Sequence, residues 1–434
     1  MTATAPPAVT ATAPPAGTSE PTRRTTMRFG CFISPLHPIG EDLNLLYRRD
    51  LEFAELVDSL NYEELWIGEH HSAGWGTIPS PEIFIAAAAE RTRRIKFATG
   101  VTALPYHHPF MVAERALQLD HMTRGRFILG CGAGSVISDM HMFGIAPEST
   151  RERTAQALET VVDLLAGRTV TRDEDWFRLV DARLQLDPFT PGGPEVTVAS
   201  AATPFGVKLA GRLGVSVLSH AAPPWGAVRS GHTLGIERLA DQWRHHEEAA
   251  AEAGRQVSRD DWRLVVPVHV APTREEAMDD IRDGWLRQRN ELWIDTFGIP
   301  MSRNPMSGAK AFEATVAANG IIAGDVEDVV TAIDKLQEIT GGFGTLLISC
   351  QDWAPRPAQA RSLDLFARFV VPRFRGTTDR LRASNDWAAA NRTVMQEAGF
   401  AARTKAMAEH APASPASPDA PASPADGATG PSGE

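Results

Sequence analysis

The sequence has no long hydrophobic run. No apolar stretch reaches the roughly 18 to 20 residues that a membrane-spanning helix requires. Segment 1–26 is rich in Ala, Pro and Thr, and it lacks the apolar centre of a secretory signal. We therefore expect a cytoplasmic protein that does not bind a membrane.

Positive charge is in deficit. The chain has 43 lysines and arginines against 54 acidic residues, which gives a formal net charge of −11. Nucleic acids and anionic membranes favour a basic surface. We expect neither as a partner, and a small-molecule ligand is the better prediction.

Cysteine and several catalytic motifs are also scarce. The three cysteines, Cys31, Cys131 and Cys350, lie in strand-like runs without a C-x-x-C spacing, which predicts buried thiols and no disulfide. The sequence contains no G-x-S-x-G motif and no phosphate-binding P-loop. Hydrolase and kinase chemistry therefore has no support.

What the chain does have is a regular alternation of strand-like and helical segments. Eight strand-like runs precede amphipathic stretches: Met27–Ile33, Glu64–Ile67, Ile95–Thr102, Phe127–Cys131, Val196–Ala199, Val215–Leu218, Leu264–Val270 and Thr345–Ser349. Eight β/α units predict an α/β fold of the (β/α)8, or TIM-barrel, type over residues 27–375, with loop insertions at about 170–190, 219–235 and 275–325. We expect disordered tails at 1–26 and 405–434, and a helical extension at 376–404.

Polar side chains gather directly after these strands. Glu69, His70 and His71 follow the second strand, and His107 and His108 follow the third. Active sites of this fold lie at the carboxyl ends of the strands, and histidine titrates near neutral pH, so the cluster predicts proton transfer. A metal centre that includes Glu69 is the alternative, but adjacent histidines lack the i, i+4 spacing of a hydrolytic zinc site, so we predict no metal.

The run Gly130–Gly134 follows the fourth strand and alternates glycine with other residues. A dinucleotide-binding turn would need a helix immediately afterwards, and Ser135–Gly144 shows no clear helical pattern. We favour a backbone that lacks side chains so that a flat ligand can lie close to it.

Two further segments could contact an anion. Thr203 is a candidate N-cap with Pro204 at the first helical position, and Ser200 precedes them. Plain capping and an anion site at this helix start are both open. Arg151 and Arg153 open another helix, where they either contact a phosphate or stay solvated.

Together these residues resemble the bacterial luciferase-like flavin monooxygenase family over about Met27–Arg375, and the run Gly74–Pro81 most resembles its limonene monooxygenase-like branch. The matching stretches, in the family's order and spacing, are Met27–Gly30, Leu65–His71, Thr102–Pro109, Gln118–Asp120 and Gly125–Gly134.

The resemblance implies a two-component enzyme. A separate NAD(P)H:flavin reductase would supply reduced FMN, O2 would add to give a C4a-peroxyflavin, and a small organic substrate would be oxygenated by epoxidation, hydroxylation or a Baeyer–Villiger step. It also implies a homodimer. The alternatives are a deazaflavin F420-dependent dehydrogenase of the same fold and a non-catalytic flavin-binding partner subunit.

The resemblance also suggests residue roles. By position, His70 corresponds to the family's catalytic histidine, Asp139 to an acidic residue beside the flavin ring, and His108 to a pocket histidine; His71 is a further catalytic candidate. The expected cofactor-binding residues are Gly100, Val101, Thr102, Gly132, Ala133, Asp139, Arg151, Ser200 and Thr203, with a cis peptide at Gly100–Val101.

The chain departs from the family at the flavin phosphate. The arginine that grips the phosphate in luciferase falls on Ala133, and an acidic-serine pair falls near Ala201 and Ala202. Ser200, Thr203 and Arg151 or Arg153 are left as substitutes. Luciferase's reactive cysteine aligns on Gly132, so we assign Cys131 no role.

Overall fold

The structure is a computed structural model that describes residues 27–200, 203–221, 237–301 and 304–410. The chain divides into two compact units, Met1–Gly376 and Thr377–Glu434. The tail predicted at 1–26, residues 411–434 of the tail predicted at 405–434, and most of the insertion at 219–235 lie outside the described residues.

The first unit contains a closed barrel of parallel strands. Its strands are β1 (Arg28–Ile33), β2 (Glu64–Ile67), β3 (Lys96–Thr99), β4 (Thr102–Ala103), β5 (Phe127–Gly132), β8 (Glu195–Ser200), β9 (Ser216–His220), β10 (Trp262–Val266) and β13 (Thr345–Cys350). Their order is β3-β2-β1-β13-β10-β9-β8-β5-β4, and pairing of β3 with β5 closes the ring. Because β3 and β4 are two pieces of one strand, the barrel has eight strand positions, and the predicted fold is confirmed.

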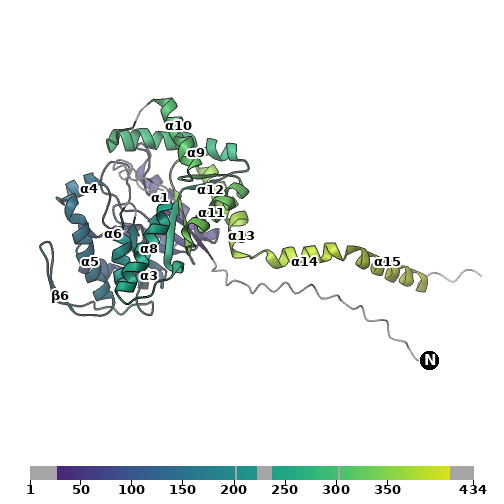
Figure 1. Ribbon diagram of the computed structural model, residues 1–434, viewed down its shortest axis with the longest axis horizontal. Coiled ribbons are helices and arrows are strands. Elements are labelled where there is room, and N and C mark those ends of the chain that lie inside the picture. Colours follow the sequence, from purple (N-terminus) through teal and green to yellow (C-terminus); the bar gives the residue numbers. More distant parts are fainter. Residues whose placement is uncertain (1–26, 201–202, 222–236, 302–303, 411–434) are drawn as a thin grey trace, which may run out of the picture. The chain divides into compact units, whose positions relative to one another are not determined.

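Helices surround the strands (Figure 1). In the first unit they are α1 (Leu43–Ser59), α2 (Pro81–Ala89), α3 (Pro109–Thr123), α4 (Ile137–Met142), α5 (Thr150–Leu165), α6 (Phe205–Leu213), α8 (Glu237–Glu252), α9 (Arg274–Gln288), α10 (Pro305–Ala317), α11 (Val326–Thr340), α12 (Arg356–Leu365) and α13 (Val371–Arg375), with short 3-10 helices η1 (Leu104–Tyr106), η2 (Pro147–Ser149) and η3 (Arg259–Asp261), and π-helical turns η4 (Arg289–Thr296) and η5 (Phe366–Val370).

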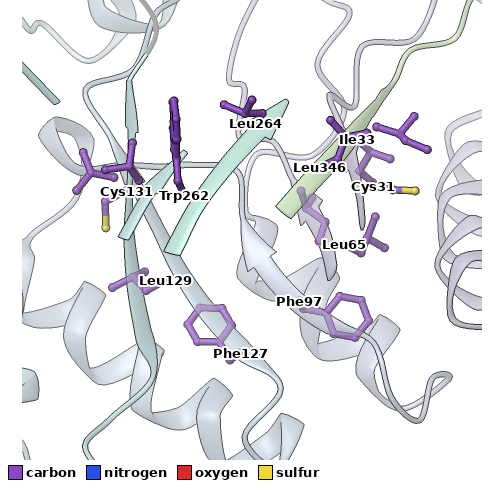
Figure 2. Packing of buried hydrophobic residues seen from close by; sticks show 14 of the residues in the cluster. Cys31, Ile33, Leu65, Phe97, Phe127, Leu129, Cys131, Trp262, Leu264 and Leu346 are labelled. Carbon is purple, nitrogen blue, oxygen red and sulfur yellow. The ribbon is translucent and has the colours of Figure 1, made fainter. Parts of the chain in front are cut away.

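Successive side chains of a strand point to opposite faces, and this alternation sorts the core into two layers. Residues such as Cys31, Leu65 and Phe97 belong to the larger cluster between the barrel and its helices (Figure 2). Their neighbours in sequence, including Phe32, Trp66 and Ala98, form a smaller cluster inside the barrel. All three cysteines are buried and unpaired, as predicted.

The amino ends of the strands, which we call the lower end of the barrel, hold a buried ion cluster. Arg263 Nε and Nη2 donate to the Glu64 carboxylate at 2.8 and 2.9 Å, and Nη1 and Nη2 donate to Glu195 at 2.7 and 3.0 Å. Trp66 Nε1 donates to the same Glu64 at 2.8 Å. At the lower end, one guanidinium is therefore held between two carboxylates, and each of its three nitrogens donates a hydrogen bond.

Two insertions extend the barrel. Strands β6 (Val170–Asp173) and β7 (Arg178–Ala182) form an antiparallel hairpin. Strands β11 (Val268–Val270) and β12 (Ile322–Gly324) pair with each other. Helices α9 and α10, with the turn η4 between them, contribute Trp285, Phe312 and Trp293 to a second hydrophobic cluster. These two helices lie at one end of the first unit, at the top of Figure 1.

The second unit contains two helices in its described part, α14 (Asp379–Ala390) and α15 (Arg392–Glu409). Helix α15 continues past the tail boundary expected at residue 404, and Lys405 and Glu409 form an i, i+4 ion pair at 3.8 Å. The Ala-rich composition that suggested disorder also favours helix, which explains the later end. Within the described residues, no helix is long and apolar enough to cross a membrane.

Candidate active site

The carboxyl ends of the strands, which we call the upper end of the barrel, bring the predicted polar residues together. Glu69, His70 and His71 follow β2, His107 follows η1 at the end of the third strand, and Asp139 lies on α4 after β5. Strands β2, β3 and β5 are parallel neighbours. Their carboxyl ends therefore place these side chains in one cluster.

Glu69 is the centre of the cluster. Its side chain is 1% exposed, and its Oε1 lies 2.8 Å from the Nε2 atoms of both His71 and His107. Its Oε2 accepts the Ala103 N–H at 3.2 Å. Burial alone would raise the pKa of Glu69, but the hydrogen bonds and charges of His107 and His71 lower it. Glu69 is therefore a buried carboxylate that stays ionised.

These three residues could also hold a metal ion, since their ligand atoms lie within 4.8 Å of one another. As they stand, two imidazole donors already satisfy one carboxylate oxygen. The absence of a metal stays a prediction.

His70 belongs to a second, adjacent group. Its Nδ1 lies 4.0 Å from Asp139 Oδ2, and Asp139 is 2% exposed. Asp139 Oδ1 accepts the His71 backbone N–H at 3.3 Å and the Ser72 hydroxyl. Burial lowers the pKa of His70, and the Asp139 charge only partly opposes this. His70 is therefore a neutral imidazole near pH 7, with a carboxylate beside it.

Local backbone packing fixes His70. Its N–H donates to Ile78 O at 3.3 Å, and a Cβ added to Gly76 would lie 2.3 Å from the His70 Cβ. Glycine at position 76 therefore lets the loop fold back against the histidine.

Aromatic rings pack against one side of the cluster. The His71 ring meets Phe143 edge-on with centroids 4.9 Å apart, and Phe143 stacks on Tyr106 at 4.9 Å. Burial is the main cause that raises the pKa of Tyr106. The Tyr106 hydroxyl is buried and, among the described residues, has no hydrogen-bond partner. Such an unsatisfied buried group calls for a ligand or a water molecule.

The glycine-rich end of β5 exposes backbone without side chains beside these rings. A Cβ on Gly132 would lie 2.6 Å from a Val101 methyl, and a Cβ on Gly134, at φ +74°, would lie 2.4 Å from the Tyr106 hydroxyl. The Gly100–Val101 peptide is cis, as the resemblance implied. The Thr102 hydroxyl is buried and also lacks a partner within the described part of the chain. Gly100, Val101, Thr102, Gly132 and Ala133 thus lie in or directly next to β4 and β5, which pair with each other.

A helix follows the glycine run after all. Ser135–Gly144 was expected to lack one, but α4 spans Ile137–Met142. It is too short to show a 3.6-residue period, and helices of this length depend on tertiary contacts. Here Asp139 and Met140 are its buried residues, and they hold it against the site.

The predicted anion contacts are less closely gathered. Helix α6 begins at Phe205 with Pro204 as its N-cap, so the predicted Thr203 cap is wrong by one residue. The reason is a local contact, in which the buried Ser200 hydroxyl donates to Thr203 O at 3.1 Å. Arg151 is exposed. The Arg153 guanidinium instead lies 5.3 Å from the Trp176 ring centroid, and its buried Nε has no hydrogen-bond partner among the described residues.

The histidines after the third strand differ from each other. His108 is exposed, and its ring lies 5.9 Å from Phe177, whereas His107 reaches Glu69. A role for His108 stays a prediction. Sequence reasoning placed His107 in the predicted proton-transfer cluster but gave it no role of its own, and it missed Tyr106. No signal in two adjacent histidines tells which one faces inward.

A large cavity among the described residues lies away from this cluster. It measures about 1130 Å³ and is lined by the loop after β1, by α9 and by the loop after β13, including Glu41, Asp283 and Trp353. None of the clustered histidines lines it, so chemistry and not cavity size identifies the candidate site.

Comparisons with known proteins agree with this geometry. A protein-family model described as luciferase-like monooxygenase matches residues 27–341. The chain is 54% identical over 362 residues to 4-hydroxyprotoasukamycin monooxygenase of Streptomyces nodosus subsp. asukaensis, covering 83% of this chain and 96% of that protein. It is 40% identical over 387 residues to limonene 1,2-monooxygenase of Rhodococcus erythropolis, covering 88% and 97%.

A solved structure is also similar. It is the oxygenating constituent of 3,6-diketocamphane monooxygenase from Pseudomonas putida, a type II Baeyer–Villiger monooxygenase in complex with FMN. The two structures align with a TM-score of 0.66 at 26% identity, covering 80% of this chain and 98% of that one.

Proposed function

We propose that this chain, which belongs to the luciferase-like monooxygenase family and is a flavin-dependent monooxygenase, is the FMN-using oxygenating component of a two-component system. A separate NAD(P)H:flavin reductase supplies its reduced flavin, and O2 and a small organic molecule are its substrates. The relative described as an oxygenating constituent in complex with FMN supports both the cofactor and the reductase.

One observation carries the choice of site. Two buried hydroxyls, Thr102 Oγ1 and Tyr106 Oη, lack partners within the described residues beside a backbone thinned at Gly132 and Gly134. A flat ring with polar edges fits that combination, because its edge atoms would satisfy the hydroxyls, and the glycines let Val101 and Tyr106 lie close to the backbone that the ring would face. The flavin ring would be held by Gly100, Val101, Thr102, Gly132, Ala133 and Asp139.

Reduced FMN, when bound, supplies the two electrons with which O2 gives one oxygen atom to the substrate and one to water. The protein's part is to orient the reactants, exclude water and move protons. His70 suits proton transfer, because burial keeps its imidazole neutral while Asp139, 4.0 Å from its Nδ1, stabilises the ring once it gains a proton. His71 and His108 are the further catalytic candidates.

The phosphate of FMN would lie between two helix starts. Arg153 is in the first turn of α5, Ser200 and Thr203 precede α6, and the two helices pack against each other. The unpartnered Arg153 Nε favours Arg153 over the exposed Arg151 as the main cationic contact, since a buried guanidinium is stabilised by an anion.

The proposal is tested by loading the protein anaerobically with reduced FMN and mixing it rapidly with oxygenated buffer. We expect oxidised-flavin absorbance to return more slowly than for free reduced FMN. His70→Ala should release more hydrogen peroxide while it still binds FMN, whereas His245→Ala, a surface histidine paired with Glu248, should behave as wild type. Lack of reduced-FMN binding together with binding of reduced F420 would overturn the proposal.

The phosphate contact is tested by flavin fluorescence titration. Arg153→Met should weaken FMN by about tenfold or more but leave riboflavin almost unchanged, because only FMN has the phosphate. Arg151→Met should have a smaller effect, and the exposed Arg178→Met is the matched control. Equal losses for both ligands in Arg153→Met would exclude the contact.

A further inference from the structure

Glu69 and His107 have no assigned role in the proposed reaction, yet Glu69 is hydrogen-bonded to both His107 and His71. Both imidazole Nε2 atoms lie 2.8 Å from one oxygen, Glu69 Oε1. A carboxylate oxygen only accepts, so each ring must present an N–H at Nε2. Among the described residues, no hydrogen-bond partner reaches His71 Nδ1.

Charge decides how the protons are shared. A buried carboxylate needs one compensating positive charge. His107 is the better cation, since its pKa is raised despite burial by its hydrogen bond and charge interaction with Glu69. One cation balances Glu69, so His71 can then donate as a neutral ring.

The other charged groups around the network leave this balance intact. Glu82 on α2 and Arg115 on α3 both act on His107, with opposite signs, and they lie 3.9 Å from each other. On the other side, His70 and Asp139 form their own group, and Asp139 contacts only the backbone N–H of His71. Tyr106 meets His71 through its ring.

We propose that Glu69 and His107 are positioning residues that hold His71 as the neutral Nε2–H tautomer, so that its Nδ1 is a proton acceptor at the flavin site. The inference rests on the proposed function, because it gives the monooxygenase a second proton-accepting histidine beside His70. The hydroxyl-lined site would then have two imidazoles with different partners, one next to Asp139 and one bound to Glu69.

The test is nitrogen-15 NMR of histidine-labelled protein without flavin, in which His71→Gln identifies the His71 signals. We expect wild-type His71 to show protonated Nε2 and unprotonated Nδ1 near pH 7. In Glu69→Gln the signals should shift toward a mixture of tautomers. Glu82→Gln removes a nearby carboxylate that does not touch His71, and it should leave the tautomer unchanged.

A second variant keeps the test decisive if Glu69→Gln does not fold. His107→Gln removes the cation, so His71 should take the positive charge beside Glu69 and show both nitrogens protonated. An Nε2–H tautomer unchanged in every folded variant, or wild-type His71 with both nitrogens protonated, would overturn the inference.

Catalytic readouts separate the inference from the proposed function. Glu69→Gln should lower coupled oxygenation by about tenfold or more and displace its pH profile, while FMN affinity stays within about threefold. Failure of the wild-type protein to bind reduced FMN would refute the function but leave the tautomer result standing. The expected tautomers with an unchanged pH profile would refute the positioning role alone.

Discussion

The two ends of the barrel both bury carboxylates, but they compensate them differently. At the lower end, Arg263 is fully buried and donates to both Glu64 and Glu195. At the upper end, Glu69 and Asp139 are surrounded by imidazoles, hydroxyls and backbone N–H groups. Arginine is charged at every accessible pH, whereas histidine gains and loses its proton near neutrality.

The difference separates stability from chemistry. The lower cluster holds its charges permanently, and its polar atoms are paired with one another. The upper cluster contains groups that exchange protons, and the Thr102 and Tyr106 hydroxyls there are unsatisfied among the described residues. Barrels of this type place catalytic residues at the carboxyl ends of the strands and stabilising ones at the other end.

The largest expected loss of stability follows from replacing Arg263 at the lower end. Arg263→Met would leave the buried Glu64 and the half-buried Glu195 without this cation, which should cost about 3 to 5 kcal/mol of unfolding free energy. Urea denaturation measures the loss. Arg178→Met, which breaks an exposed pair with Asp173 at 3.5 Å, should change stability by less than about 1 kcal/mol. A similarly small change for Arg263→Met would contradict a stabilising role for the lower end.

An ion pair of His37 with two carboxylates at the upper end should make the free energy of unfolding depend on pH. His37 lies 3.1 Å from Asp50 and 3.3 Å from Asp352, and although burial opposes it, these carboxylates raise the pKa of His37 from 6.5 to about 9. Because the folded pKa is raised, the stabilisation is complete below pH 6.5 and is lost as pH rises through about 9. We expect a loss of about 2 kcal/mol over this window.

Urea denaturation midpoints measured from pH 6 to 10 test whether the His37 ion pair stabilises the protein. His37→Gln should be less stable at pH 6 and should lose most of the slope between pH 7 and 9. An equal slope in both proteins would assign the pH dependence to other groups.

Asp139→Asn should sharpen the contrast between the two ends. The amide keeps the shape of the carboxylate but removes the charge beside His70. The free energy of unfolding should therefore fall by only about 1 to 2 kcal/mol. Oxygenated product per flavin oxidised should fall much further, by about a hundredfold. Product and hydrogen peroxide measured in the same reactions check this, and proportional losses of stability and coupling would contradict it.

The smallest expected effect on stability comes from alanine substitutions in the glycine-rich backbone at the upper end. Gly134 and Gly144 have similar positive φ angles, +74° and +65°, but only Gly134 faces Tyr106, and nothing lies within 4 Å of a Cβ at Gly144. Alanine at either position should cost about 1 kcal/mol for the left-handed backbone. Only Gly134→Ala should also weaken FMN in fluorescence titration, and equal FMN affinities would argue against ligand contact there.

Much of the fold could be predicted because parallel barrel strands are short, apolar and separated by amphipathic helices. All eight strand positions agree with the predicted runs to within a few residues. Helix α4 was missed because six residues carry too little periodicity. Thr203 was misplaced as a cap because Ser200 bonds to the Thr203 carbonyl and the helix starts one residue later.

The sequence by itself determined the barrel, the family and the end of the barrel where chemistry is expected, because hydrophobic periodicity and motif spacing are local properties of the chain. Only the tertiary structure decided that His107 and not His108 meets Glu69, that Asp139 belongs to His70, and that Arg153 lies on Trp176. Those pairings join residues 23 to 69 positions apart, and neighbouring side chains of one type can point to different sides. Which of them meet depends on how the strands and loops close around one another.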